Sequence, residues 1–326
     1  MDKVALTLAI GDYEHTRDLA SGRVQVQGVT LNVLTLSPEE TFFRFTRFRE
    51  WDVSEMSMGK YVALRSQDDD SIAAIPVFPS RVFRHSMIYV RDGGGIERPE
   101  QLKGARIGVP EWAQTAVVYA RGYLVHQVGV PLDSPDWVQA GVNEFGRVEK
   151  VKLRLPGGVR LKPEPGRCLN DMLLAGDLDA VLSARPPIGL GRGIRRLFPD
   201  YEAAEEAYFR QTGIFPIMHV IAIKADVLAR HPWLAMNLYK SFDEAKRRSL
   251  ERLSDITASH APLAWIAPYA ERMKALFGED FWPYGLERNR KTLQAFVDYA
   301  FEQGVCHRRL ALEELFPRQV LTSFKV

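Results

Sequence analysis

Three cationic side chains lie within five residues of one another, beside an apolar run that is typical of a strand. The segment Ile75–Val90 contains Arg81, Arg84 and His85, and a glycine-rich break follows at residues 91–95. A guanidinium group can bind a carboxylate through two parallel hydrogen bonds, and a histidine can transfer a proton near neutral pH. This pattern predicts an anion site at a hinge between two lobes. The alternative is a surface strand whose arginines form salt bridges.

Two more segments place anion-binding groups at strand ends. Ala105–Val109 is typical of a strand, and the polar turn Pro110–Thr115 leads into an apolar helix, so free backbone amides would face an anion. An ordinary strand-to-helix connection is the simpler interpretation of that turn. A short buried strand at 180–183 delivers Arg185 to its carboxyl end, where open α/β sheets bind their ligands.

The composition argues against several classes of function. A chain of 326 residues is long enough for two lobes, and 46% hydrophobic with 26% charged residues is typical of a globular protein. Since 43 basic and 41 acidic side chains leave a net charge of only +2, we expect neither nucleic acid nor an anionic membrane surface as a partner. Cys168 and Cys306 match no zinc or redox spacing, and we expect two reduced, unreactive thiols, with a disulfide between them as the alternative.

The N-terminal sequence predicts a cytoplasmic protein. Its apolar run spans only about seven residues, an aspartate stands at position 2, and no small-residue cleavage site follows, which is unlike a signal peptide. No segment approaches the roughly 18 consecutive apolar residues of a membrane span. The oligomeric state stays open, a homo-oligomer included.

Alternating strand and helix patterns predict an α/β fold with two lobes. We expect residues 1–90 plus 213–326 to form the first lobe and 92–210 the second, with crossovers near 90–95 and 205–215. A ligand would lie in the cleft between the lobes. Ser37 is the expected N-cap of a helix in the first lobe, and we expect its phenylalanines to pack in the core; they are Phe42, Phe43, Phe45 and Phe48.

Three segments form a specific combination: Glu50–Gly59 (EWDVSEMSMG), Phe78–Ser86 (FPSRVFRHS) and Gly213–His219 (GIFPIMH). Together they resemble the 4,5-dihydroxyphthalate decarboxylase family, and the resemblance covers nearly the whole chain. It implies a cytoplasmic enzyme with the two-lobed type II periplasmic binding protein-like fold. His15 is a departure, because we expect the family to have a different polar residue in that loop. Fold alone does not fix function, and close relatives can take other aromatic acids.

The resemblance implies non-oxidative decarboxylation of 4,5-dihydroxyphthalate to 3,4-dihydroxybenzoate (protocatechuate) and CO2, in phthalate degradation, without an organic cofactor. Each ring carboxylate of that substrate is para to a hydroxyl, so loss of the hydroxyl proton sends electron density to the carbon that bears the carboxylate. A general acid then protonates that ipso carbon, and CO2 leaves as aromaticity returns. The enzyme must therefore bind an aromatic dicarboxylate, assist a phenol and supply one proton to carbon.

This chemistry suggests roles for particular side chains. Arg81 and Arg185 would clamp the carboxylates, one from each lobe, and Arg84 is a weaker candidate because strand alternation points it away from Arg81. His85 and His219, on the strands nearest the crossovers, are the candidates for proton transfer. Other candidates are Ser57 and Thr115 for hydrogen bonding, Trp112 for ring stacking, and Glu14 and Glu111 for accepting the phenol proton. The alternatives are structural histidines, a packing tryptophan and solvated carboxylates.

No residue spacing predicts a metal site, because the seven histidines form no HxH or HExxH pattern. A divalent metal held by His85, His219 and a carboxylate is a less favoured alternative. A rival function is a non-catalytic cytoplasmic receptor or sensor for an aromatic acid. A pyrimidine-precursor synthase of the same fold would have a cysteine-rich motif, which this chain lacks, and Gly189–Gly193 does not match the GxGxxG pattern of dinucleotide-binding dehydrogenases.

Overall fold

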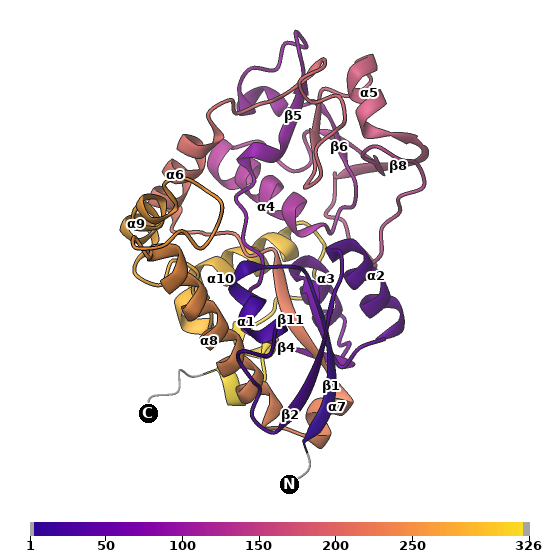
Figure 1. The fold of residues 1–326 in the computed structure, drawn as a ribbon. Helices are drawn as coiled ribbons and strands as arrows, with labels where there is room; N and C mark the ends of the chain where they lie inside the picture. Colours follow the sequence, from indigo (N-terminus) through magenta and orange to yellow (C-terminus); the bar gives the residue numbers. More distant parts are fainter. Residues whose placement is uncertain (1–2, 322–326) are drawn as a thin grey trace.

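The computed structural model describes residues 3–321 as two α/β lobes, each built around one sheet (Figure 1). The first lobe has the strand order β2-β1-β3-β11-β4, and the second has the order β10-β5-β9-β6-β7-β8. The strands of the first sheet are β1 (Val4–Ile10), β2 (Val29–Thr35), β3 (Val53–Ser57), β4 (Ile72–Ile75) and β11 (His219–Lys224). The strands of the second sheet are β5 (Ile88–Arg91), β6 (Arg106–Val109), β7 (Asp136–Gly141), β8 (Arg160–Cys168), β9 (Ala180–Leu182) and β10 (Ile194–Arg196). The predicted two-lobed α/β architecture is confirmed.

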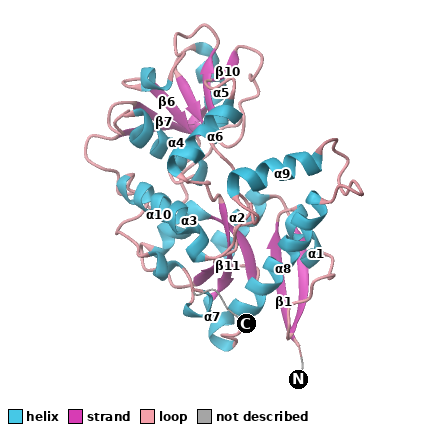
Figure 2. Cartoon of the chain, turned by 90° about the vertical axis from the view of Figure 1, so that its left-hand side faces the viewer, coloured by secondary structure: helices cyan, strands magenta, loops and turns pink. Residues whose placement is uncertain are grey.

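Helices cover both sheets and also join the lobes. In Figure 2, α3 and α10 of the first lobe lie beneath the second lobe, and both contact α4 of that lobe. Among residues 3–321, no helix combines the length and apolarity needed to span a bilayer. The helices are α1 (Arg17–Ala20), α2 (Pro38–Phe48), α3 (Met58–Arg65), α4 (Thr115–Tyr123), α5 (Leu169–Ala175), α6 (Tyr201–Thr212), α7 (Ala225–Arg230), α8 (Leu234–Ser254), α9 (Ile266–Phe277) and α10 (Leu286–Glu302).

The chain enters the second lobe earlier than the sequence predicted. β5 pairs antiparallel with β9 and β10 of the second sheet, so the predicted crossover near 90–95 is too late, and the crossing runs through residues 76–87. The strand expected over 84–90 begins only at Ile88, because His85–Met87 form a 3-10 turn. The return from β10 to β11 runs through α6 and includes the predicted region 205–215.

Helix α2 begins where predicted but does not pack as predicted. The Ser37 side chain accepts a hydrogen bond from the Glu40 backbone N–H, and proline follows at the first helical position. Of the four phenylalanines expected in the core, only Phe45 is fully buried. Phe43 and Phe48 are exposed, whereas Phe42 lines a cavity between the lobes. The helix therefore presents one face to that cavity.

The register of β3 and β11 brings three polar side chains to one face of the first sheet. β3 runs parallel to β1 and antiparallel to β11, with His219 opposite Ser57 and Ile221 opposite Glu55. Side chains two residues apart on a strand share a face, so Glu55 and Ser57 lie on the same side as His219. Because every residue of β3 is buried, this register is strongly constrained.

The two cysteines are buried and form no disulfide, as expected of reduced structural thiols. Burial raises the pKa of the Cys306 thiol to about 12, so the reactive thiolate is disfavoured.

Candidate active site

A cavity of about 480 Å³ lies between the two lobes. The first lobe contributes the start of α2, the junction of β3 with α3, and the start of β11, and the second lobe contributes three segments near residues 111–116, 147–150 and 184–186. Part of the predicted set lines this cavity, namely Ser57, Arg84, Glu111, Thr115, Arg185 and His219. The predicted site residues that do not line it are Glu14, Arg81, His85 and Trp112.

His219 is held by a buried carboxylate. Its Nδ1 lies 2.5 Å from Oε1 of Glu55, whose side chain is 0% exposed. Glu55 also accepts hydrogen bonds from the Tyr13 hydroxyl at 2.6 Å and the Gly11 backbone N–H at 2.8 Å. Burial would raise the pKa of Glu55, but His219, Tyr13 and Gly11 outweigh burial and hold that pKa below its usual value. Glu55 is thus an anion with three fixed donors.

His219 also lines the inter-lobe cavity. The ring edge packs against Phe42, with 4.7 Å between ring centroids. No side chain or backbone group of residues 3–321 hydrogen-bonds its Nε2. This arrangement of carboxylate, imidazole and unpaired nitrogen is typical of a histidine that transfers a proton.

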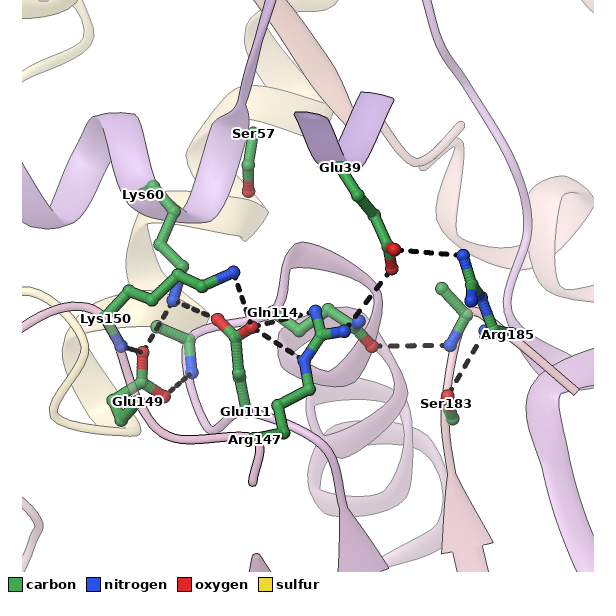
Figure 3. A network of polar contacts seen from close by, with 12 residues as sticks. Glu39, Ser57, Lys60, Glu111, Gln114, Arg147, Glu149, Lys150, Ser183 and Arg185 are labelled. Atoms are coloured by element: carbon green, nitrogen blue, oxygen red, sulfur yellow. Dashed lines mark hydrogen bonds and ion pairs between the residues drawn. The ribbon is translucent and has the colours of Figure 1, made fainter. Parts of the chain in front are cut away.

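Cations from both lobes surround the cavity. Lys60 on α3, which is in the first lobe, contacts Glu111 and Glu149 of the second lobe at 2.7 and 2.6 Å. Arg147 and Lys150 also contact Glu111, at 2.8 and 3.2 Å (Figure 3). Sequence reasoning missed Lys60, Arg147 and Lys150 as site residues.

Glu111 lies at the centre of these cations and is almost completely buried. Burial would raise the pKa of the Glu111 carboxyl, but Lys60, Lys150 and Arg147 outweigh it and lower the pKa to about 2. A carboxylate of such low basicity does not suit the predicted role of accepting the phenol proton.

Arg84 is the cavity cation that forms no ion pair within residues 3–321, although the charge of Glu205 acts on it from further away. Its Nε and Nη1 contact the sulfur atoms of Met218 and Met87, at 2.9 and 2.8 Å. Burial lowers the pKa of Arg84 to about 10, so the guanidinium still carries its charge at neutral pH. A partly desolvated cation with only thioether contacts is a strong site for an anion.

Ser57 and Thr115 meet across the lobes. Their hydroxyl oxygens are 2.9 Å apart, and Oγ1 of Thr115 also accepts the Gly59 backbone N–H at 2.8 Å. Ser57 precedes the first residue of α3, as predicted, and Thr115 is the first residue of α4. The amino ends of two helices therefore face the cavity, which adds to its positive potential.

The chain is 38% identical over 330 residues to 4,5-dihydroxyphthalate decarboxylase from Comamonas testosteroni, and the match covers 100% of both proteins. The chain belongs to the 4,5-dihydroxyphthalate decarboxylase family. A second member, from Pseudomonas putida, is 39% identical over 214 residues, which are 64% of this chain and 83% of that protein. No family model matches the chain.

Solved structures share the fold of this family member at low sequence identity. The periplasmic aliphatic sulphonate binding protein SsuA from Escherichia coli matches with a TM-score of 0.54 and 10% identity, over 98% of this chain and 99% of that one. The desulfurization enzyme DSZB matches with a TM-score of 0.53 and 16% identity, over 96% of each chain. These similarities confirm the predicted periplasmic binding protein-like fold.

In this decarboxylase family member, Arg81 lies inside the first lobe rather than at the cavity. It is 5% exposed and donates to the backbone carbonyls of Phe215 and Pro283, at 3.1 and 2.7 Å, and to the Asn289 side chain. These contacts tie three distant segments together and do not support a carboxylate clamp. The ranking of Arg81 above Arg84 rested on strand alternation, which fails because this segment is not a regular strand.

His85 and Trp112 are also packed away from the inter-lobe cavity. His85 is 4% exposed and surrounded by Tyr123, Phe198 and Tyr208, and burial lowers its pKa to about 4. Trp112 is 0% exposed, donates its indole N–H to the Gln303 carbonyl, and stacks on a buried arginine. The structural alternatives considered for both residues describe these positions better than the predicted roles.

Glu14 forms ion pairs with Arg17 and Arg252, at 3.0 and 3.1 Å, on a different face of the first lobe. It lines a separate, mainly apolar cavity together with His15. Among residues 3–321, no group of three histidine, cysteine, aspartate or glutamate side chains is arranged to hold a metal ion.

Proposed function

We propose that this protein decarboxylates 4,5-dihydroxyphthalate to 3,4-dihydroxybenzoate and CO2 in the inter-lobe cavity. One observation supports the proposal most: His219, which is fixed through Nδ1 by the buried Glu55, lines a cavity that is bordered by cations. The full-length similarity to the 4,5-dihydroxyphthalate decarboxylase from Comamonas testosteroni agrees with the proposal.

The charge around the cavity suits a dianion. Within residues 3–321, five cations border the cavity and form ion pairs with three carboxylates, so the cations outnumber their ion-pair partners by two. The cations are Lys60, Arg84, Arg147, Lys150 and Arg185, and the carboxylates are Glu39, Glu111 and Glu149. The two carboxylates of the substrate would supply two negative charges. In our proposal Arg84 binds one of them and the arginines at the second lobe bind the other.

The proton step would take place at Nε2 of His219. The ring hydroxyl para to the departing carboxylate gives its proton to water, and the positive potential of the cavity stabilises the resulting phenolate. The His219 imidazolium then gives its Nε2 proton to the ring carbon that bears the carboxylate. The C–CO2 bond breaks and its electron pair restores the aromatic ring as a phenolate. Water then returns one proton to the phenolate and one to Nε2 of His219. Glu55 holds the ring in place and balances the positive charge of the imidazolium.

The proposal uses no organic cofactor and no metal. It includes the predicted cytoplasmic location and leaves a homo-oligomer open. The positioned acid would supply about 10²–10⁴-fold of the acceleration, and orientation and electrostatics the rest.

The test is to mix the purified protein with 4,5-dihydroxyphthalate, with and without a chelator, and to measure CO2 and 3,4-dihydroxybenzoate. We expect equal amounts of both products and no effect of the chelator. Saturable binding without CO2 release would instead favour a receptor or sensor. Turnover of a differently hydroxylated aromatic acid, but not of this one, would favour a related decarboxylase.

A further inference from the structure

Glu39 lies between two arginines of the opposite lobe. It belongs to the first turn of α2 in the first lobe, and its two carboxylate oxygens contact Arg147 at 3.3 Å and Arg185 at 2.9 Å in the second lobe (Figure 3). One carboxylate bound by two guanidinium groups is the arrangement that a substrate carboxylate would need at the same place. Glu39 therefore resembles a bound ligand group.

The three carboxylates that pair with the cations differ in how easily they can be displaced. Glu111 is 3% exposed and contacts three cations, and Glu149 is 13% exposed and also accepts the Ala113 backbone N–H, so removing either would leave buried charges unpaired. Glu39 is 52% exposed, and within the described part of the chain it forms ion pairs with these two arginines alone. Water can solvate Glu39 when it leaves, and exposed ion pairs are weak.

The two arginines that bind Glu39 differ in exposure and in their other contacts. Arg185 is 61% exposed and Arg147 is 29% exposed, and Arg147 keeps its contact with Glu111 when Glu39 moves away. Exchange of Glu39 for another carboxylate thus leaves the remaining network in place.

We propose that Glu39 is an internal competitor, which occupies Arg147 and Arg185 in the empty cavity and is displaced by one carboxylate of the ligand. This inference deepens the proposed function, since it rests on a dicarboxylate binding in the inter-lobe cavity. Glu39 is then a specificity-determining residue: a ligand must bring a carboxylate that replaces it, and affinity is lowered by the competition.

The chain offers a matched control for this idea. Glu40 is the neighbour of Glu39 in the first turn of α2, so both carboxylates interact similarly with the helix amino end. Glu40 pairs with Arg44 on the same helix, at 2.7 Å, and does not line the cavity. Glutamine at either position removes one negative charge and keeps the side-chain shape.

The experiment compares wild type, Glu39→Gln and Glu40→Gln in two assays. The first is calorimetric binding of phthalate, which has both carboxylates but no hydroxyl to drive decarboxylation. The second is kcat and KM for 4,5-dihydroxyphthalate. We expect Glu39→Gln to bind phthalate about 3–10-fold more tightly and to lower KM by a similar factor, with Glu40→Gln unchanged.

The outcomes separate the two proposals. If wild type turns over the substrate and Glu39→Gln binds phthalate equally or more weakly, the competitor role is overturned and the proposed function stands. If nothing is turned over but Glu39→Gln binds phthalate more tightly, the competitor role stands and the proposed function fails. Absence of phthalate binding in all three proteins would overturn the competitor role, and an equal gain in both variants would reduce it to a general charge effect.

Discussion

Replacing Glu55 by glutamine is the most informative perturbation of the proposed proton-transfer site. The carboxylate now accepts from three donors: the Gly11 N–H, the Tyr13 hydroxyl and Nδ1 of His219. A glutamine has one acceptor oxygen and one donor nitrogen, so it cannot satisfy all three donors. If its oxygen stays with Gly11, its amide N–H faces Nδ1, which must then be an unprotonated acceptor. The imidazolium, which needs a proton on both nitrogens, loses its partner.

The expected size of the effect follows from this geometry. Because Glu55 is buried and does not line the cavity, the glutamine leaves the ligand contacts intact. KM for 4,5-dihydroxyphthalate should therefore stay within about twofold, while kcat falls by about 10²–10⁴, the usual contribution of a positioned acid or base. That loss corresponds to about 3–5 kcal/mol of transition-state stabilisation. Since the Tyr13 hydroxyl and a neutral Nδ1 of His219 can both accept from the glutamine amide, no buried group is left unpaired and the melting temperature should change little.

The assay is steady-state formation of 3,4-dihydroxybenzoate, with circular dichroism melting as the check on folding. Tyr13→Phe is the matched control, because it removes one hydrogen bond to Glu55 and keeps the contact between Glu55 and His219. We expect it to lower kcat by about tenfold or less. A folded Glu55→Gln protein with kcat within about threefold of wild type would refute the role assigned to His219 and Glu55.

Three further predictions test other parts of the molecule. Arg84→Gln should raise KM by about 10–100-fold, because it removes the cavity cation that forms no ion pair with a carboxylate. Arg106→Gln, on the surface of the second lobe, is the control and should leave KM unchanged. Equal KM values in wild type and both variants would contradict the anion site. Arg81→Met should lower the free energy of unfolding by roughly 3 kcal/mol, measured in urea, since one buried and two partly buried acceptors lose their donor. It should leave kcat/KM of the folded protein near wild type, and a large loss of kcat/KM at full stability would restore the carboxylate clamp. The pKa of His85 is lowered to about 4 by burial, below its unfolded value near 6.5, so its contribution to stability is present above pH 6.5 and is lost as pH falls toward 4. Between pH 7 and pH 5 wild type should therefore lose roughly 2 kcal/mol more than His85→Phe, and parallel pH profiles would show that His85 does not carry this dependence.

Much of the fold could be predicted from the sequence, because its signals are local. The Ser37 cap, the apolar runs that form β1 and β11, and the short strand before Arg185 are each fixed by neighbouring residues. The same signals placed His219, Arg185, Ser57 and Thr115 at element ends, which is why these residues line the cavity.

The rest of the site depends on contacts between distant segments. Arg81 and Arg84 differ by three positions, and only the irregular backbone before β5 decides that Arg84 faces the cavity while Arg81 turns into the first lobe. Arg147 and Lys150 lie in a segment without helix or strand, so no periodicity points to them. Glu55 is a further example, because β3 mixes apolar and polar residues and only the structure shows that the whole strand is buried and that this carboxylate needs partners.

The most direct test of the central claim is proton NMR of the reaction in D2O with wild type and His219→Asn. We predict that wild type releases CO2 and forms 3,4-dihydroxybenzoate with one deuterium at the ring carbon that carried the lost carboxylate. His219→Asn, folded and able to bind phthalate, should form this product at least about 100-fold more slowly. Equal rates for the two proteins, or binding without any product in wild type, would contradict the account.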